Sequence, residues 1–220
     1  MKIISPSHVL ETPIHGEHGR ALLRLIERAA RTCYKSECKI TAESAGEFVR
    51  KISQVKKHVS VIEHASITVR FICDRGVTHE IVRHRIAAYS QESTRYCNYG
   101  KDQFGKEITV IRPPFWSECD HRYQFWLTAC QAAEVAYFAM LDYGATPQEA
   151  RSVLPNSLKT EIVMTANLRE WRHVMQLRCS EAAHPQMRQL MLPLLLDFKA
   201  SLPEIFDDIH PQITSAHDTV

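Results

Sequence analysis

Apolar residues recur at helical spacing in several segments of the chain. Between about 20 and 34, leucine, isoleucine and alanine repeat every three or four positions, which predicts a helix with one buried face. Thr41 precedes a second pattern of this kind and is a suitable N-cap for it. The segment from about 117 to 143 predicts the longest helix, begun by Ser117 with Asp120.

Polar residues mark the starts of the shorter predicted helices. Thr146-Pro147-Gln148-Glu149 is a capping box with proline at the first helical position, and Asn167 can cap another helix. Thr78 is placed to cap a short helix whose end carries Arg83-His84-Arg85. We expect a loop after this helix because the following residues are polar and lack helical periodicity.

The last predicted helix begins at His184-Pro185 and continues through a leucine-rich segment. Pro193 lies inside that pattern and should bend or split the helix, because proline cannot donate a backbone hydrogen bond. The short tail after Leu202 is expected to be dispensable for the core.

Three segments have the composition of strands. In the range 66–72, apolar and polar residues alternate, as in a sheet with one buried face. The range 107–111 is a second strand, stopped by Pro113-Pro114, and 162–166 is a third. We therefore predict one α+β domain over 1–220, with a central, mainly antiparallel sheet, flanking helices and a long helix near 117–143.

The composition is that of an ordinary globular chain. Of the 220 residues, 45% are apolar and 24% are charged, and 27 basic side chains face 25 acidic ones. A net charge of +2 gives no extended positive field for nucleic acid, so any basic site must be local. Because no apolar run reaches about 18 residues and the N-terminus lacks a signal-peptide pattern, we expect a cytoplasmic protein without a membrane span.

Cysteine and histidine give no strong signal for a disulfide framework or a metal. The seven cysteines are scattered without a Cys-x-x-Cys pair, which favours reduced thiols. His58, His64 and His79, or Cys33 with Cys38, lack the spacing of a zinc site. We expect no metal. Cys97 has no partner base or helix N-terminus to activate it as a nucleophile.

The segment from Arg83 to Arg95 is too polar for a core. It contains three arginines, one histidine, two serines, a glutamine and a glutamate. Arginine binds phosphate oxygens with two parallel hydrogen bonds, and Ser93 with backbone N–H groups could complete a phosphate site. The alternative is a solvated arginine cluster paired with Glu80 and Glu92, and spacing alone does not separate the two.

The same segment resembles the signature of flavin-dependent thymidylate synthases, which is Arg-His-Arg, seven residues and then Ser. Here it reads Arg83-His84-Arg85, 86–92 and Ser93, followed by Arg95-Tyr96. Two distant segments also fit, 150–155 and 167–178, and a weaker echo lies at 58–64. The resemblance thus covers the middle half of the chain.

The resemblance implies an enzyme that converts dUMP to dTMP. Reduced FAD would deliver hydride, methylenetetrahydrofolate would donate one carbon, and NADPH would be the reductant. It also implies a homotetramer whose active sites are shared between subunits, with no nucleic acid or membrane partner. The flavin would be held by side chains, because the seven glycines include no Gly-x-Gly-x-x-Gly fingerprint.

Motif position assigns residues to the two ligands. The dUMP-binding residues implied in this way are Glu80, Arg83, Gln91, Glu92, Ser93, Arg95, Arg151 and Arg178. The FAD-binding residues are Ser60, Arg83, His84, Arg85, Gln91, Asn167, Arg169 and His173. The family pattern often has Asn-Glu where this chain has Ser90-Gln91, so the ligand-contacting role falls to either Gln91 or Glu92.

Arg178 is the predicted catalytic residue. A guanidinium does not act as a base near neutral pH, but it can stabilise negative charge that develops on the uracil ring. The alternative role is a helix C-terminal arginine that satisfies backbone carbonyls. Ser93 is expected to position the nucleotide, since no histidine–aspartate pair is there to activate it.

Two other classes of function compete with this interpretation. A small nucleic-acid-binding module could use the arginines Arg83, Arg85 and Arg95 for phosphates and nearby tyrosines for stacking, but the near-neutral charge disfavours it. A phosphate-ester hydrolase needs a metal cluster or paired carboxylates, for which the sequence gives no pattern. Retention of a yellow flavin by the purified protein separates the first alternative from the enzyme.

Overall fold

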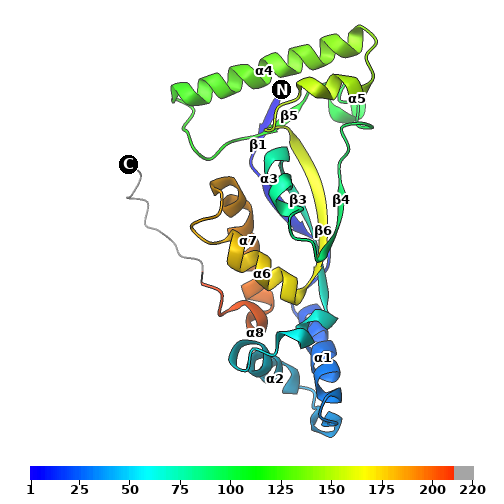
Figure 1. The fold of residues 1–220 in the computed structure, drawn as a ribbon, viewed down its shortest axis with the longest axis vertical. Helices are drawn as coiled ribbons and strands as arrows, with labels where there is room; N and C mark the ends of the chain where they lie inside the picture. Colours follow the sequence, from blue (N-terminus) through cyan, green and yellow to red (C-terminus); the bar gives the residue numbers. More distant parts are fainter. Residues whose placement is uncertain (211–220) are drawn as a thin grey trace. The chain divides into compact units, whose positions relative to one another are not determined.

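The computed structural model describes residues 1–210 and has an α+β fold, as the sequence predicts (Figure 1). The strands are β1 (Lys2–Ile4), β2 (Ser7–Leu10), β3 (Ser66–Asp74), β4 (Ala87–Gln91), β5 (Thr109–Ile111) and β6 (Lys159–Asn167). The helices are α1 (Glu17–Thr32), α2 (Ser44–Arg50), α3 (Arg75–Ile81), α4 (His121–Asp142), α5 (Pro147–Ala150), α6 (Leu168–Arg178), α7 (Pro185–Ser201) and α8 (Pro203–Phe206). Short 3-10 or π-helical turns are η1 (Glu37–Lys39), η2 (Lys51–Val55), η3 (Val59–His64), η4 (Asp102–Phe104) and η5 (Arg151–Val153).

The strands form two sheets. A four-stranded antiparallel sheet has the order β2-β3-β6-β4, and β1 pairs in parallel with β5 in a second, two-stranded sheet. Both long strands, β3 and β6, alternate between buried and partly exposed residues along most of their length. This is the pattern of strands with one face against a core, so the strands predicted at 66–72 and 162–166 are confirmed.

Contacts within the chain group into two compact units. Unit 1 contains 1–7, 71–83 and 89–163, and unit 2 contains 8–70, 84–88 and 164–220. The division falls inside β2, β3, β4 and β6, so each of these strands contributes residues to both units. The prediction of a single domain over 1–220 stays a prediction.

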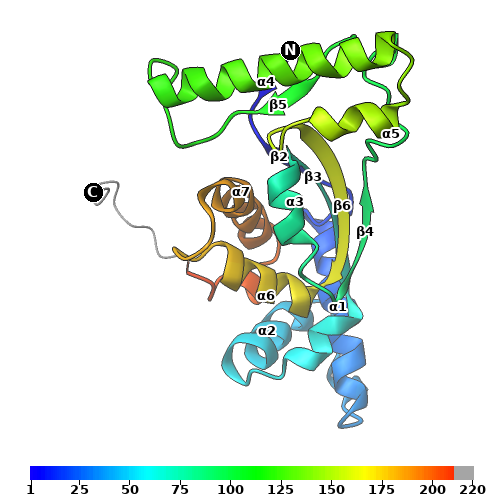
Figure 2. The ribbon, with the colours of Figure 1, turned by 45° about the horizontal axis from the view of Figure 1, so that its top comes forward.

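Unit 1 is built around its long helix, α4, which lies beside α5 (Figure 2). Its core contains Tyr99, Ile108, Val110, Cys130, Tyr137, Ala150 and Leu158. Asp120 caps α4 by accepting a hydrogen bond from the backbone N–H of Arg122 at 2.8 Å. Ser117 therefore lies before the helix, which begins four residues later than the predicted start.

Unit 2 is mainly helical, with α1 packed on α2, and α6 and α8 on α7 (Figure 1). Its largest buried side chains are Trp171, Phe198 and Phe206. Gly19 lies in the first turn of α1, where a Cβ atom would stand 2.4 Å from the carbonyl oxygen of Ile14. Only glycine fits there without moving the backbone.

Two predicted helix caps are wrong. Thr41 does not cap α2, because the hydroxyl of Ser44 accepts from the Thr41 N–H and donates to the buried carboxylate of Glu27 on α1. Thr78 does not cap α3, because the carboxylate of Asp74 accepts from the N–H of Val77 at 2.7 Å. The bond from Ser44 reaches a residue 17 positions away, whereas Asp74 caps α3 through a local contact three positions long.

Three further expectations need correction. The loop expected after Arg83-His84-Arg85 contains a strand, β4, which acquires its hydrogen bonds as the neighbour of β6 in the sheet. Pro193 does not split α7, which is continuous over seventeen residues, and the alternative of a bend stays a prediction. The segment after Leu202 is not a dispensable tail, because Ile205 and Phe206 of α8 are fully buried; the last residues, 211–220, lie outside the described part.

Candidate active site

The helix α6 carries much of the candidate site in unit 2. Asn167 caps this helix as predicted, accepting from the N–H of Glu170 at 2.9 Å. Since side chains three or four positions apart share a helix face, Arg169 and His173 lie on one side of α6 while Trp171 and Val174 are fully buried. One helix therefore presents polar groups on one side and anchors the core with the other.

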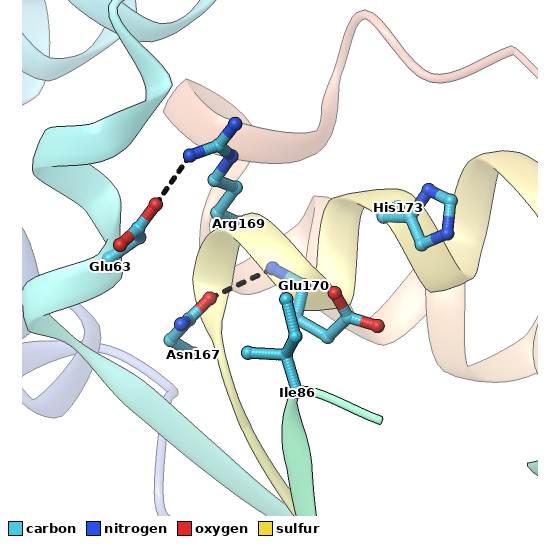
Figure 3. Close-up of a pocket in the computed structure, with 6 residues that line it drawn as sticks. All are labelled: Glu63, Ile86, Asn167, Arg169, Glu170 and His173. Carbon is cyan, nitrogen blue, oxygen red and sulfur yellow. Dashed lines mark hydrogen bonds and ion pairs between the residues drawn. The ribbon is translucent and has the colours of Figure 1, made fainter. Parts of the chain in front are cut away.

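A cavity of about 430 Å³ opens beside this polar face (Figure 3). It is lined by Glu63, Ile86, Asn167, Arg169, Glu170 and His173. The guanidinium of Arg169 points toward Glu63 and bonds its carboxylate at 2.6 Å (Figure 3). Three residues predicted to bind FAD, Asn167, Arg169 and His173, thus meet at one cavity.

His84 is the buried member of the Arg-His-Arg motif. Its side chain is 4% exposed, whereas Arg83 and Arg85 on either side of it are exposed. Nε of Arg178 donates a hydrogen bond to Nε2 of His84 at 3.0 Å. The other ring nitrogen, Nδ1, lies 3.4 Å from the carboxylate of Glu170. The motif is thereby joined to the predicted catalytic residue within unit 2.

The contact with Arg178 defines the protonation of the imidazole. A guanidinium has only donors, so Nε2 of His84 must accept and the ring proton belongs on Nδ1. Burial is the main cause that lowers the pKa of His84 to about 4, and the neighbouring Arg178 and His173 lower it further. His84 is therefore a neutral imidazole near neutral pH, with its N–H directed at Glu170.

This low pKa predicts how stability depends on pH. In the unfolded chain a histidine takes up a proton near pH 6.5, whereas folded His84 does so only near pH 4. Between these values the unfolded state binds more protons, so stability falls as pH falls through this window, by up to about 3 kcal/mol in total. Denaturant unfolding of the protein and of His84→Asn across the window checks this expectation. The variant should lose part of the pH dependence, and equal slopes for both proteins would contradict it.

The cluster of His84, Glu170 and His173 also has the composition of a metal site. One donor atom from each residue lies within 4.8 Å of the others. The bond from Arg178 occupies one nitrogen of His84 and places a guanidinium beside the cluster, which disfavours a cation there. The bond between Arg178 and His84 therefore favours a cluster without a metal.

The remaining FAD candidates of unit 2 are exposed. Ser60 lies in η3, and together with His58 it lines a second cavity of about 270 Å³ next to α1 and η2. The side chain of Arg85 is exposed in the segment before β4. His64 is exposed at the end of η3 and lines neither cavity. His184 caps α7, accepting from the N–H of Gln186.

Unit 1 contains the candidate nucleotide-binding residues, Arg178 excepted. Arg83, Arg95 and Arg151 are exposed, and Glu80 is half-buried in α3. Arg151 lies in η5, and its guanidinium is 3.5 Å from the hydroxyl of Thr94. Ser93 accepts from the backbone N–H of Arg95 at 3.3 Å. Arg83 and Gln91, which were predicted to contact both ligands, belong to unit 1.

Glu92 and Gln91 differ in their surroundings. Both oxygens of Glu92 have partners, because Tyr99 donates its hydroxyl proton at 2.8 Å and the ammonium group of Lys159 lies 3.0 Å away. Burial would lower the pKa of Lys159, but its bonds to Glu161 and Glu92 outweigh this and raise it. The amide nitrogen of Gln91 donates to Thr78 at 3.1 Å. Both oxygens of the Glu92 carboxylate are thus engaged by other side chains of unit 1.

Cys97 lies beside this network as a poor nucleophile. Burial, and after it the Glu92 carboxylate, raises the pKa of the Cys97 thiol. Because the thiolate is the reactive form, we expect Cys97→Ala to keep the turnover rate within about twofold of the wild type. A rate assay with Cys119→Ala, an exposed cysteine of the same unit, as control checks this. Loss of turnover in the Cys97 variant alone would overturn the assignment.

Sequence reasoning missed Glu170 as a member of the site. A signal for it was present, because Asn167 followed by Glu170 places a carboxylate at the third position of the helix, as in a capping box. That pattern predicts a bond to the backbone, whereas the structure directs Glu170 at His84. The missing information was the approach of a residue 86 positions earlier in the chain, which no local pattern contains.

Solved structures identify the fold. The UMP/dUMP methylase PolB from Streptomyces cacaoi, bound with 5-Br dUMP, is similar with a TM-score of 0.72 and 21% identity, covering 94% of this chain and 96% of that one. Thymidylate Synthase X from Helicobacter pylori, with FAD and dUMP, gives a TM-score of 0.69 and 21% identity, covering 93% and 98%. The chain thus has the fold of these nucleotide-modifying enzymes.

Sequence similarity is more specific. The family described as thymidylate synthase complementing protein, Thy1, matches residues 18–204. Flavin-dependent thymidylate synthase from Geobacter sulfurreducens is 39% identical over 190 residues, covering 83% of this chain and 80% of that protein. The enzyme from Mycobacterium tuberculosis is 35% identical over 213 residues, covering 88% and 81%. This chain belongs to the flavin-dependent thymidylate synthase family.

Proposed function

We propose that this protein methylates dUMP to dTMP, with methylenetetrahydrofolate as the carbon donor, FAD as the hydride carrier and NADPH as the reductant. Membership of the family over residues 18–204 supports this reaction. The observation that carries it is the bond between His84 of the signature motif and Arg178, the predicted catalytic residue. Two segments recognised separately in the sequence meet at one place in unit 2.

The residues around the larger cavity fit a flavin. Its volume of about 430 Å³ lies in the range of ligand pockets, roughly 300–1,000 Å³. Asn167 supplies an amide, His173 an imidazole and Arg169 a guanidinium, which suit the polar edge and the phosphates of a dinucleotide. We assign FAD to these three residues with Ser60, His84 and Arg85, and to Arg83 and Gln91 of unit 1.

The exposed arginines of unit 1 fit a nucleotide phosphate. Arg95 and Arg151 offer planar donors for bidentate bonds to phosphate oxygens, and the Ser93 hydroxyl can add another donor. We assign dUMP to Glu80, Arg83, Gln91, Ser93, Arg95 and Arg151, with Arg178 from unit 2. Gln91 takes the ligand-contacting role over Glu92, because both oxygens of Glu92 already have partners.

Arg178 is proposed to stabilise negative charge on the uracil ring. Preorganised donors aimed at developing charge lower the barrier most when they need no reorganisation during the reaction. The bond to His84 supplies such preorganisation, because it uses Nε and so fixes the plane of the guanidinium. His84 is neutral near neutral pH, so it adds no second positive charge to Arg178.

The proposed oligomeric state and cellular location rest on membership of the family. We infer a cytoplasmic homotetramer with shared active sites, acting on small molecules and without nucleic acid. Phe125 and Val135 on α4 support assembly, since 74% and 70% of these apolar residues are exposed and a second subunit could cover them. No helix within residues 1–210 is long and apolar enough to span a membrane. Light scattering after size exclusion tests the tetramer.

The reaction is tested by anaerobic reconstitution. Purified protein is mixed with FAD, NADPH, dUMP and methylenetetrahydrofolate, and the nucleotides are separated by chromatography. We expect dTMP in the complete mixture and none when NADPH or methylenetetrahydrofolate is omitted. Bound flavin without any dTMP would overturn the proposed reaction and leave a flavin- and nucleotide-binding protein.

A further inference from the structure

Glu170 is a buried carboxylate beside the candidate site that the functional assignments leave unused. The residue is 8% exposed, although burying a carboxylate costs free energy unless partners compensate for it. Its backbone N–H is bonded to Asn167, and its side chain reaches Nδ1 of His84 at 3.4 Å. It lines the larger cavity with His173 (Figure 3).

The side chains of Glu170, His84 and Arg178 lie in a row, with a hydrogen bond between Arg178 and His84 and a 3.4 Å approach between His84 and Glu170. Arg178 donates to Nε2 of His84 at 3.0 Å, and Nδ1–H of His84 faces the Glu170 carboxylate. The hydrogen bond made by one ring nitrogen decides which tautomer an imidazole adopts. A carboxylate at Nδ1 favours the Nδ1–H form and leaves Nε2 as an acceptor.

We propose that Glu170 is a positioning residue that acts through His84, holding the imidazole in the Nδ1–H tautomer so that Nε2 orients the guanidinium of Arg178. The inference rests on the proposed function of Arg178 as the group that stabilises charge on the uracil ring. The charged and titratable groups that face His84 include Glu170, Arg178 and His173, and the His173 ring meets that of His84 edge-on with 5.7 Å between centroids.

Electrostatics also supports an effect of the Glu170 carboxylate on His84 and, through it, on Arg178. A carboxylate bonded to one nitrogen of an imidazole makes the other nitrogen a better acceptor, as in metal sites where a carboxylate orients the ligating histidine. Without Glu170, only the contact with Arg178 would favour the Nδ1–H form, so the Nε2–H form, whose proton opposes the Arg178 donor, would become more populated. Arg178 would then lose the contact of its Nε with His84 without losing its charge.

The first test follows the tautomer, independently of turnover. Nitrogen-15 chemical shifts of labelled histidine distinguish the two neutral tautomers, and His84→Asn identifies the His84 signal among the 12 histidines. We expect Nδ1–H in the wild type and a shift toward Nε2–H in Glu170→Ala. Glu170→Gln keeps an acceptor oxygen, so it should preserve the tautomer. An unchanged His84 signal in Glu170→Ala would overturn the inference.

The second test follows kinetics in the FAD-loaded enzyme. Glu170→Ala should lower kcat by about tenfold to a hundredfold, while the KM for dUMP and the FAD content stay within about twofold. Glu170→Gln should recover most of the rate. The matched control is Glu47→Ala, which removes an exposed carboxylate on α2 and should leave kcat unchanged. Loss of FAD with an unchanged kcat per bound flavin would assign Glu170 to cofactor binding and overturn the positioning role.

A double variant tests whether Glu170 acts on turnover through Arg178 or independently of it. Arg178→Lys keeps a positive charge but lacks the planar Nε–H donor, so it should break the connection to His84. In that background Glu170→Ala should change kcat by less than about twofold, because the path it acts on is already interrupted. A full, multiplicative loss in the double variant would contradict the inference. A wild-type enzyme that makes no dTMP would overturn the proposed function and leave the tautomer result standing.

Discussion

Arg178→Ala should abolish most turnover while leaving the nucleotide bound. Removing a preorganised donor from developing negative charge costs on the order of 10²- to 10³-fold in kcat. Binding of dUMP should weaken by no more than about tenfold, because the phosphate is assigned to other arginines, such as Arg95 and Arg151. Single-turnover formation of dTMP and equilibrium binding of dUMP measure the two effects separately.

Arg178→Lys is the control for charge. It keeps a cation but replaces a planar fork with a single ammonium group, so we expect a kcat between those of the wild type and the alanine variant. FAD content should be unchanged in both variants. An Arg178→Ala enzyme with more than about a tenth of the wild-type kcat would remove Arg178 from the catalytic step.

Trp171→Ala should destabilise the protein by about 3–5 kcal/mol. The indole is fully buried, donates to the carbonyl oxygen of Ile67 at 2.9 Å and meets the ring of Phe198 edge-on at 5.4 Å. Truncation removes this packing and leaves a buried carbonyl without its donor. Such a loss is a large fraction of the 5–15 kcal/mol that is typical of folded proteins.

Trp171→Phe separates packing from hydrogen bonding. Phenylalanine keeps an aromatic ring in the core but has no N–H group, so the expected cost falls to about 1–2 kcal/mol. Urea unfolding followed by circular dichroism gives both values. A loss below about 1 kcal/mol for the alanine variant would show that neighbouring side chains refill the site, contrary to this expectation.

Local sequence patterns predicted helix starts whose capping residues lie close together in the sequence. The Asn167 cap and the capping box at Thr146 depend on residues within three positions of each other, and both are present in the structure. The start of α2 was misplaced because Ser44 bonds to Glu27, which lies 17 residues away. The side chains of the range 87–91 are small or polar and predict a loop, whereas pairing in the sheet makes this range a strand.

The sequence predicts which residues belong to the candidate site, but it does not predict which of them contact one another. Motif position gave His84 and Arg178, but the bond between them joins residues 94 positions apart. Glu170 carried only a helix-start signal, so its contact with His84 could not be read from spacing. Burial also had to come from the structure, because nothing local distinguishes the buried His84 from the exposed arginines beside it.

The helix α6 has consequences for how this enzyme can diversify. Its core side is occupied by Trp171 and Val174, while Arg172 is held by the carboxylate of Asp208 at 2.6 Å. Its ligand side is occupied by the assigned residues. Gln176 and Leu177 are exposed and belong neither to the core side nor to the ligand side of α6. Substitutions should therefore accumulate at these two positions without loss of folding or activity. Libraries that seek altered substrates should therefore vary the loops around the cavity and keep the core and ligand-side positions of this helix.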